Sequence, residues 1–478
     1  MPPLQFHNTL SSKVEPFVPL SSRTVKMYNC GPTVYDRQHL GNMFAVVFSN
    51  TLRRALEAWG YKVNQVINIT DFGHLSSDAD EGEDKMSIGL KREGLAPTLA
   101  NMRKMAEKFA QIYLDDIALL GVPVEDIPFP RASDYIEEQV ALIRSLEQKG
   151  YAYTTSDGVY FDTKKFKDYG KLGNIQVQEL QEGARVEANP EKKSPADFAL
   201  WKLSKDLGWK SPWGKGFPGW HIECTAMIFK LLGKQIDIHT GGIEHVPVHH
   251  NNEIAQAEAA TGKQFVQYWM HNAHITIEGK KISKSLGNTV YLSQIIDRGL
   301  SPRAFRYWVL TGHYRTPMNF TWEAIEGADQ ALKRLTRAYL EAAEINSSAQ
   351  RTGHPAEGGV RRSKQNEFMK AFYAALANDL GTAQSIALMW DNLKTLDKAT
   401  FKKIDQILGL GFSDPRETAK LKVVEANDLP SDVQRLVTAR EEARAQKDFT
   451  RADELRTQIE ESGYTLKDTA EGPKITKE

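Results

Sequence analysis

The sequence has only two cysteines, Cys30 and Cys224, in 478 residues. Two thiols cannot build a disulfide framework, and a reducing compartment would keep them free for a metal or for chemistry. No apolar run reaches the length of a bilayer span, and residues 1–18 lack the basic start and apolar stretch of a signal peptide. We therefore expect a cytoplasmic protein that contacts no membrane.

An excess of charge of one sign is also missing, since 61 Lys and Arg balance 61 Asp and Glu. There is no global basic field of the kind that marks many nucleic-acid-binding proteins, so any contact with RNA must come from a local face. The sequence shows no internal repeat and no low-complexity tract. Its composition is that of an ordinary globular protein, and its length predicts two to four domains.

What is present begins with a β-α-β pattern near the N-terminus. Residues 25–29 form a short apolar run that ends at a Cys-Gly-Pro turn, which predicts a strand. Residues 44–59 carry apolar side chains on a 3.6-residue period, and residues 62–69 predict a second strand. This order is typical of a parallel, nucleotide-binding sheet, whose ligands bind beyond the carboxyl ends of the strands.

The later segments predict an insertion and a helical region. Residues 76–94 suggest a loop, residues 99–150 a helical stretch and residues 151–161 a hairpin, all within an insertion. Residues 219–288 would complete the sheet, and the pattern from residue 324 onward is almost wholly helical. We predict an α/β fold in which a Rossmann-like parallel-sheet catalytic domain with an insertion is followed by an all-α C-terminal bundle. The predicted boundaries are 1–110 and 213–290 for the catalytic halves, 111–212 for the insertion, 291–330 for a junction and 331–478 for the bundle.

Two short segments have chemistry that suits a triphosphate. His39-Leu40-Gly41-Asn42 lies between the first strand and the first helix, where backbone N–H groups and the helix dipole favour an anion. Lys281-Ile282-Ser283-Lys284-Ser285 is a basic, hydroxyl-rich loop whose lysines could stabilise the charge that grows on phosphates. Each segment alone has a structural alternative, which is a cap and a turn for the first and a solvated basic loop for the second.

Two thiols, an imidazole and a carboxylate form a candidate metal site. His249 and Glu253, spaced i and i+4, would lie on one face of a helix. Together with Cys30 and Cys224 they make a plausible zinc site, and the carboxylate favours a working metal over a structural one. His250 is the alternative to His249, because an i to i+3 spacing also puts it near Glu253. For either thiol alone, burial as a small apolar side chain is the competing interpretation.

The two phosphate-type segments resemble the HIGH and KMSKS signatures of class I aminoacyl-tRNA synthetases, in the same order. The segments around them are similar to the cysteinyl-tRNA synthetase family, over nearly the whole chain. These segments are residues 30–36 (CGPTVYD), 219–224 (GWHIEC), 237–239 (DIH), 249–253 (HHNNE), 313–319 (HYRTPMN) and 378–383 (NDLGTA). The chain departs from the family pattern at Asn251, at Thr240 and in residues 72–85, where an Asp-rich segment is replaced by a longer loop that contains Lys85.

The resemblance implies that the protein activates L-cysteine with ATP and Mg²⁺, releases pyrophosphate, and transfers cysteine from the adenylate to the 3′ end of tRNA(Cys). One zinc per chain would bind the substrate thiolate, which separates cysteine from serine because zinc prefers a soft ligand. Residues 291–330 would contact the tRNA stem and residues 331–478 would bind tRNA, including its anticodon. A monomer is expected.

The same resemblance assigns roles to individual residues. The catalytic residues would be His39, Asn42, Lys281 and Lys284, and the ATP contacts would add Gly41 and Ser283. The contacts of the cysteine substrate would be Cys30, Gly31, Thr33, Thr70, Trp220 and His239. The zinc ligands would be Cys30, Cys224, His249 and Glu253.

Two other functions fit parts of the sequence. An ATP-dependent ligase could activate cysteine in the same way and transfer it to an amine on a small molecule, but it would have no use for the helical C-terminal region. A non-catalytic, RNA-binding relative would usually lose the signature lysines or the metal ligands, and both sets are intact. The C-terminal arginines, among them Arg440 and Arg444, either bind phosphate or belong to a solvated mixed-charge surface.

Overall fold

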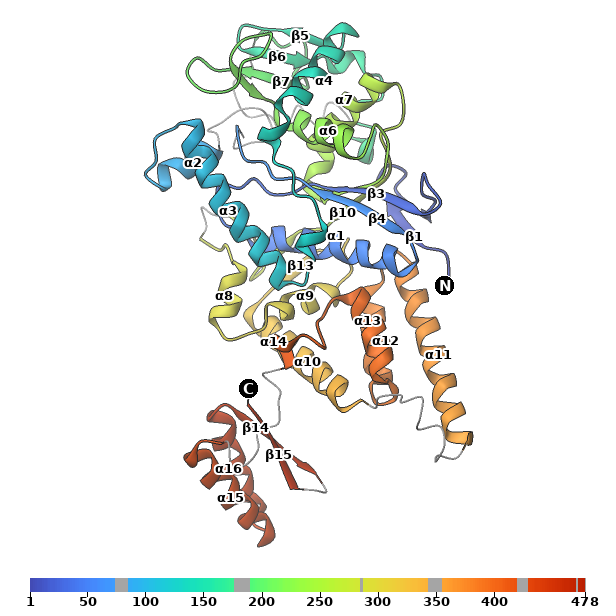
Figure 1. Cartoon of the computed structure of the whole chain (residues 1–478), viewed down its shortest axis with the longest axis vertical. Coiled ribbons are helices and arrows are strands. Elements are labelled where there is room, and N and C mark those ends of the chain that lie inside the picture. The colour runs from blue at the N-terminus through green and yellow to red at the C-terminus, as the bar shows by residue number, and fades with distance from the viewer. Residues whose placement is uncertain are drawn as a thin grey trace.

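The computed structural model describes residues 1–73, 85–175, 190–283, 287–342, 355–418, 429–469 and 472–477. Its centre is a four-stranded parallel sheet in the order β10-β9-β3-β4 (Figure 1). The first two strands of this sheet, β3 and β4, have the helix α1 (Leu40–Ala58) between them and confirm the predicted β-α-β unit. The four strands are β3 (Thr24–Asn29), β4 (Lys62–Ile67), β9 (Ile236–Gly242) and β10 (Val266–Asn272).

Helices cover both faces of this sheet because its strands are apolar on both sides. Val25 and Met27 of β3 pack with Phe44 and Leu52 of α1 in one buried cluster. The next residue, Tyr28, points to the opposite face, since side chains alternate along a strand. There it packs in a second cluster with the helices α6 (Trp220–Leu231) and α7 (Asn251–Thr261). The sheet is therefore the middle of three layers, as in other α/β folds with a parallel sheet.

The insertion forms its own antiparallel sheet at one end of the molecule (Figure 1). Its core holds Ile143, Phe161 and Trp201, all fully buried. Asn251, which departs from the family pattern, accepts from the main-chain N–H of Leu172 at 3.1 Å and so ties the insertion to α7. The elements of this part are α4 (Ile136–Gln148), β5 (Ala152–Thr154), β6 (Gly158–Phe161), β7 (Phe198–Leu203) and β8 (Gly216–Pro218).

The expected loop at residues 76–94 needs a correction. Residues Lys85–Arg92 form the helix α2, with Met86 and Leu90 buried against α3 (Leu99–Leu119). The side chains of Met86 and Leu90 lie on one face of a short amphipathic helix, a pattern that the surrounding charges concealed. Residues 74–84 lie outside the described residues. The proposed boundary at 110/111 falls inside α3, and β8 extends the insertion past residue 212.

The helices that follow the sheet in the sequence share a core with α1. Phe305 of α9 (Pro302–Leu310), Leu335 of α10 (Trp322–Glu341) and Leu408 of α13 (Lys398–Leu408) belong to the same cluster as α1. The proposed boundary at 330/331 falls within α10. The other elements of this region are β11 (Ile275–Ile277), β12 (Lys280–Lys281), α8 (Leu292–Asp297), β13 (Met318–Phe320), α11 (Pro355–Ala377), α12 (Thr382–Asn392) and α14 (Pro415–Thr418).

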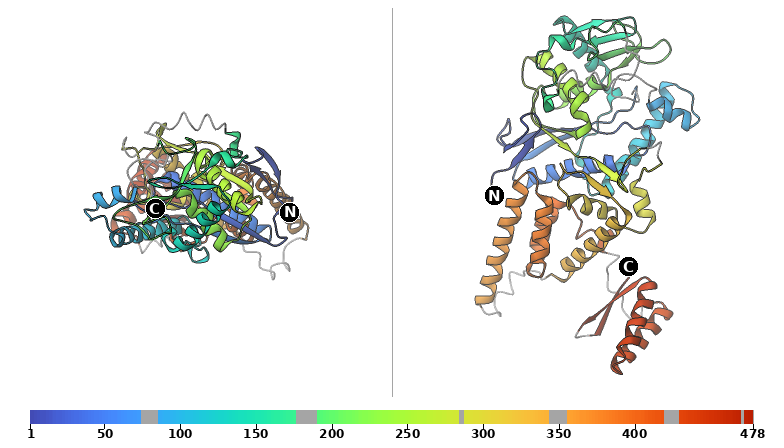
Figure 2. Two further views of the ribbon diagram at one scale, coloured as in Figure 1. Left: turned by 90° about the horizontal axis from the view of Figure 1, so that it is seen from above. Right: turned by 180° about the vertical axis from the view of Figure 1, so that it is seen from behind.

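The last part of the chain has its own core. We call it the C-terminal unit, and it comprises residues 429–469 and 472–477. Val433, Ile459 and Leu466 are buried together, apart from the larger cluster. The predicted helices are present as α15 (Ser431–Ala445) and α16 (Phe449–Glu461), but the hairpin of β14 (Tyr464–Thr469) and β15 (Gly472–Lys477) corrects the all-α description of this end. The C-terminal unit lies at the end of the long axis opposite the insertion (Figure 2).

Two further features complete the fold. A short antiparallel hairpin of β1 (Gln5–Asn8) and β2 (Lys13–Pro16) lies beside β10. Asp379, in the turn between α11 and α12, accepts from the main-chain N–H of His7, the hydroxyl of Tyr314 and the guanidinium of Arg315, at 2.6–2.8 Å. The turn thereby fastens the helical region to the N-terminal hairpin. Within the described part of the chain, no helix combines the length and the apolar character needed to cross a membrane.

Candidate active site and metal centre

The candidate site lies where the strand order of the sheet changes direction. From β3 the chain continues to β4 on one side, whereas β9 and β10 extend the sheet on the other side. Ligands of open parallel sheets bind in the crevice at this point, beyond the carboxyl ends of the strands. A cavity of about 690 Å³ opens there, a size that suits a nucleotide or a drug-sized ligand. Among its lining residues are Cys30, Gly31, Thr33, His39, Gly41, Asn42, Thr70, Trp220, Cys224, His249 and Lys281.

The two signature segments meet at the start of α1. His39 caps the helix with extended backbone, and the main-chain N–H of Leu40 donates to the carbonyl of Val290 at 2.9 Å. Val290 follows the KISKS loop, so both segments share one wall of the cavity. Gly41 leaves room here, because a Cβ at this position would lie 3.2 Å from the Ile282 side chain and 2.9 Å from the His39 ring.

The KISKS loop leaves a hairpin and is closed by one side chain. Lys281 ends β12, which pairs with β11, and it lines the cavity. The amide of Asn288 donates to the carbonyl of Lys281 and accepts from the N–H of Ser283, both at 2.9 Å. Ser283 is half-buried and is not among the lining residues, and Lys284 lies outside the described residues. The structure therefore places one of the two predicted lysines at the cavity.

The four predicted metal ligands come together at the other end of the cavity. One ligand atom each from Cys30, Cys224, His249 and Glu253 lies within 4.8 Å of the others. Cys30 follows β3, Cys224 lies on α6, His249 belongs to a π-helical turn (Val246–His250), and Glu253 lies on α7. Only Cys30 is partly exposed, whereas the other three are buried. Two thiols, an imidazole and a carboxylate in contact form a donor set that suits zinc.

Neighbouring rings fix how these ligands point. Nε2 of His249 lies 2.9 Å from Oε1 of Glu253, while its Nδ1 lies 3.0 Å from Nδ1 of His221. The ring of Trp220 stacks on His249 with centroids 4.2 Å apart. His221 was not among the predicted site residues, although it lies inside the GWHIEC segment. A hydrogen-bonded partner on the second ring nitrogen is a common feature of metal-binding histidines.

His239 lies behind the metal ligands rather than in the wall of the cavity. Its Nε2 is 3.0 Å from Oε2 of Glu253, and its ring stacks on Trp269 with centroids 4.6 Å apart. It is completely buried and is not among the lining residues. The structure shows a contact of His239 with Glu253, and its contact with the cysteine substrate stays a prediction.

A second set of ligand atoms overlaps the first. Cys30, His239, His250 and Glu253 also offer one ligand atom each within 4.8 Å. Nε2 of His250 lies 3.3 Å from the Cys30 sulfur, and its Nδ1 lies 2.7 Å from Nε2 of His271. His250 therefore stays the alternative ligand, as the i to i+3 spacing suggested. The set with His249 contains both thiols, which makes it the softer and the more zinc-like of the two.

The ligand groups of the metal-free protein have strongly shifted pKa values. Burial would raise the pKa of Glu253, but His239 and His249 outweigh it and lower that pKa to about 2. Burial would likewise lower the pKa of His249, but the Glu253 carboxylate raises it to about 10. A hydrogen bond from Cys30 lowers the pKa of Cys224 to about 6, whereas burial raises the pKa of Cys30 well above its ordinary value. Coupled shifts of this size inside a cavity are typical of functional sites.

Between the two ends, main-chain contacts shape the cavity. The N–H of Gly31 donates to Oδ1 of Asn68 at 2.8 Å, and a Cβ at Gly31 would lie 1.7 Å from the Asn68 carbonyl oxygen. No other residue fits at this crossing. Thr33 pairs with Thr70 in a parallel bridge, and the Thr70 hydroxyl donates to Glu223 at 3.1 Å.

Lys85 lines the cavity and is not among the site residues predicted from the sequence. Its Nζ lies 5.9 Å from the ring centroid of Trp220, within cation–π range. Lys85 and Lys281 are the only lysines or arginines among the lining residues that the structure describes. Lys85 begins α2, which lies in the segment predicted to be a loop.

Comparisons with known proteins agree with this geometry. The family described as "tRNA synthetases class I (C) catalytic domain" matches residues 16–330, and "Cysteinyl-tRNA ligase anticodon binding domain" matches residues 426–473. The chain is 42% identical over 485 residues to "Cysteine--tRNA ligase 1" of Burkholderia lata, with 99% of this chain and 97% of the relative covered. It is 40% identical to the "Cysteine--tRNA ligase" of Thermus thermophilus, with 98% of each covered.

The chain belongs to the cysteinyl-tRNA synthetase family. Solved structures of other class I enzymes share its fold at low sequence identity. The ternary complex "LeuRS-tRNA-LeuAMS" of Agrobacterium radiobacter aligns with a TM-score of 0.59 at 11% identity, covering 84% of this chain and 85% of that one. Methionyl-tRNA synthetase of Mycobacterium tuberculosis, solved with methionyl-adenylate, aligns with a TM-score of 0.55 at 13% identity, covering 81% and 88%.

The matched anticodon-binding family coincides with the C-terminal unit. Most arginines of this unit are already paired within it. Arg440 is buried and donates to both carboxylate oxygens of Asp468 at 2.8–2.9 Å, and Arg444 also contacts Asp468. These two arginines therefore hold α15 against β14.

Proposed function

We infer that the protein activates L-cysteine with ATP and transfers it to the 3′ end of tRNA(Cys). One observation carries this inference, namely that a single cavity joins the start of α1 and Lys281 with the cluster of Cys30, Cys224 and His249. The first end offers donors for the phosphates of ATP, and the second offers ligands for a metal that binds a thiol. Family membership over nearly the whole chain supports the same activity.

At the phosphate end, we assign ATP binding to His39, Gly41 and Asn42, with Lys281, Ser283 and Lys284 from the loop. The N-terminus of a helix favours an anion through its unpaired N–H groups and its dipole. Lysines that are held in place before the reaction stabilise the charge that develops as pyrophosphate leaves. Mg²⁺ would enter with ATP, as is usual for nucleotide substrates.

At the thiol end, we assign one zinc to Cys30, Cys224, His249 and Glu253. The close approach of these four donor atoms, three of them buried, fits a site that is completed by a cation. Zinc would act as a Lewis acid that binds the thiolate of cysteine. The hydroxyl of serine is a poorer ligand, so zinc would favour cysteine over serine. Cys30 is the ligand nearest to open space, and Thr33, Thr70 and Trp220 would shape the pocket for cysteine.

For tRNA, we assign the acceptor-stem side to residues 291–330 and the anticodon to the C-terminal unit. The protein would act as a monomer in the cytoplasm. The C-terminal unit lies at the far end of the long axis from the insertion, with the helical region between, which suits an elongated RNA ligand (Figure 2). The anticodon-binding family match over residues 426–473 supports this assignment.

Aminoacylation of unfractionated tRNA with each of the twenty amino acids tests the proposal. Charging with cysteine alone is the expected result. A parallel reaction should contain ATP, cysteine and small amines but no tRNA, to look for transfer to a small acceptor. Cysteine-dependent pyrophosphate exchange with no tRNA charging would contradict the synthetase function and support the small-molecule ligase. The absence of both would favour a non-catalytic relative.

A further inference from the structure

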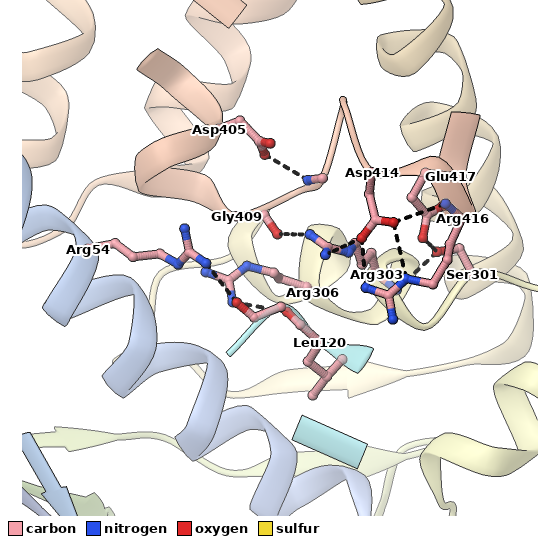
Figure 3. Close-up of polar contacts among 12 residues, drawn as sticks. Arg54, Leu120, Ser301, Arg303, Arg306, Asp405, Gly409, Asp414, Arg416 and Glu417 are labelled. Atoms are coloured by element: carbon pink, nitrogen blue, oxygen red, sulfur yellow. Dashed lines mark hydrogen bonds and ion pairs between the residues drawn. The ribbon is translucent and has the colours of Figure 1, made fainter. Parts of the chain in front are cut away.

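Three arginines converge on the C-terminal ends of two helices, and we call them the arginine cluster (Figure 3). Arg54 lies on α1, and Arg303 and Arg306 lie on α9. Their guanidinium groups donate to main-chain carbonyls at the ends of α3 and α13. The last carbonyls of a helix have no helical N–H partner, so these contacts satisfy groups that would otherwise be unpaired.

Arg306 is the centre of the cluster because it contacts three helices besides its own. Its Nε donates to the carbonyl of Leu408 at the end of α13, and its Nη1 donates to the carbonyl of Leu120 beyond α3 at 3.2 Å. Towards α1, Nη1 donates to Oδ1 of Asn50 at 2.8 Å and Nη2 to the hydroxyl of Thr51 at 3.4 Å. Four helices therefore meet at one guanidinium group.

Because Arg306 is a buried cation, its hydrogen bonds restrict how the surrounding helices can move. It is fully buried, and within the described part of the chain neither it nor Arg54 forms an ion pair with a carboxylate. Burial, followed by the nearby charges of Arg54 and Arg303, lowers the pKa of Arg306 well below its ordinary value. The partial negative charge at two helix C-termini takes the place of a counter-ion. A shift of α13 would leave a buried cation with unmade hydrogen bonds, which is strongly unfavourable.

The chain after α13 is shaped to admit the cluster. Gly409 has a φ of +65°, and a Cβ there would lie 2.8 Å from the guanidinium carbon of Arg306. Its carbonyl accepts from Nη1 of Arg303 at 2.9 Å, and Nη2 of Arg303 donates to Asp414 at 2.8 Å. The segment between α13 and α14 is thus fastened to α9 as well (Figure 3).

The helices joined by Arg306 lead to both signature segments. The helix α1 carries His39, Gly41 and Asn42 at its start and the contacts of Arg306 in its second half. The helix α9 follows the KISKS loop through α8. The helix α13, in contrast, lies beyond residues 16–330, which match the catalytic family. Arg306 is therefore a direct link between the helical region and the catalytic half.

We propose that Arg306 is a positioning residue for the transfer step, because it fixes α13 of the helical region against α1 and α9. A tRNA that binds the helical region, which contains α13, is thereby placed correctly relative to the cavity. Adenylate formation needs no tRNA, so it depends on this link much less than transfer does. The inference rests on the proposed function.

The decisive experiment compares two rates in Arg306→Lys, which keeps a long basic side chain but loses the forked donors. Cysteine-dependent pyrophosphate exchange should stay within about twofold of the wild-type rate. Single-turnover transfer of cysteine to saturating tRNA should slow by about tenfold, the scale at which buried links between sites act. The melting temperature is measured alongside, and Ile143→Val in the separate core of the insertion serves as the control for a general loss of stability.

Each outcome decides the inference. A selective loss of transfer in Arg306→Lys, with both rates unchanged in Ile143→Val, supports it. Equal losses of exchange and transfer, or no loss at all, overturn it and make Arg306 a purely structural residue. If Arg306→Lys does not fold, Asn50→Ala, which removes the Oδ1 that accepts from both Arg306 and Arg54, is measured in its place. A wild-type protein that forms the adenylate but charges no tRNA contradicts the proposed function itself.

Discussion

Nε2 of His249 lies 2.9 Å from Oε1 of Glu253, and these two groups come from consecutive elements, the π-helical turn and α7. The spacing of four residues puts both side chains on one face, as the sequence indicated. The π-helical turn also brings His250 to Cys30, on the opposite side of the same cluster. The pair of histidines therefore offers two overlapping ligand sets, and a substitution at each position distinguishes them.

We expect the purified protein to contain about one zinc per chain. His249→Asn and Cys224→Ser should lose most of this metal, whereas His250→Asn should retain it. Elemental analysis of the three variants provides the measurement, with circular dichroism to show that each is folded. Full metal in Cys224→Ser would remove the proposed set, and loss of zinc in His250→Asn alone would favour the alternative set with His239.

Zinc binding should release about two protons at about pH 7.5. The pKa of Cys224 is about 6 because Cys30 donates to it, and the pKa of Glu253 is about 2 despite burial because of His239 and His249, so both groups are already ionised. Cys30 keeps its proton because burial raises its pKa well above the ordinary value, and His249 holds an extra proton because its pKa is about 10.

Since a proton must leave Cys30 and another must leave His249, zinc affinity should rise with pH, by about 100-fold per pH unit near neutrality. Calorimetric titration of the metal-free protein in two buffers with different enthalpies of ionisation counts the protons. Glu258→Gln, on the same helix but outside the cluster, is the control and should release the same number. A release near zero would show that the ligands are deprotonated before the metal binds.

Lys281→Ala should slow cysteine-dependent pyrophosphate exchange, because Lys281 lines the cavity beside the start of α1. We expect a loss of about 10²-fold to 10³-fold, the usual effect of removing one preorganised donor to developing charge. Lys280→Ala is the matched control, since Lys280 is exposed on the same strand and is not among the lining residues. The same loss remains predicted for Lys284→Ala from the sequence. Equal rates in the two β12 variants would mean that the strand does not reach ATP.

Removal of the C-terminal unit after Thr418 should abolish tRNA charging while pyrophosphate exchange continues. This cut follows the structure, because the helices up to α13 share the large core with α1, whereas residues 429–477 have a core of their own. The remaining tRNA binding should depend less on salt, since fewer phosphate contacts release fewer counter-ions. Unchanged charging by the shortened protein would mean that the C-terminal unit does not bind the anticodon end.

The sequence predicted most of the candidate site because its residues come in short segments with a fixed geometry. A helix start places His39, Gly41 and Asn42 together, and a four-residue spacing does the same for His249 and Glu253. It missed Lys85, because the charged residues around α2 conceal the two buried side chains that make it a helix. It did not predict the contact of His239 with Glu253, since a strand pattern does not tell which side chain of another element a buried ring meets.

By itself the sequence determined the class of fold, the order of the elements and the chemistry of the ligands, since periodicity and spacing are local properties. The sequence proposed Cys30 and Cys224, 194 positions apart, as ligands of one metal, but only the tertiary structure brings the two side chains into one cluster. The tertiary structure also decided that Arg306 lies among the ends of two helices, where it pairs with no carboxylate of the described residues. Both contacts depend on how whole elements pack across the sheet. In the low dielectric of that interior, an unpaired polar group is costly, so such contacts must be made completely.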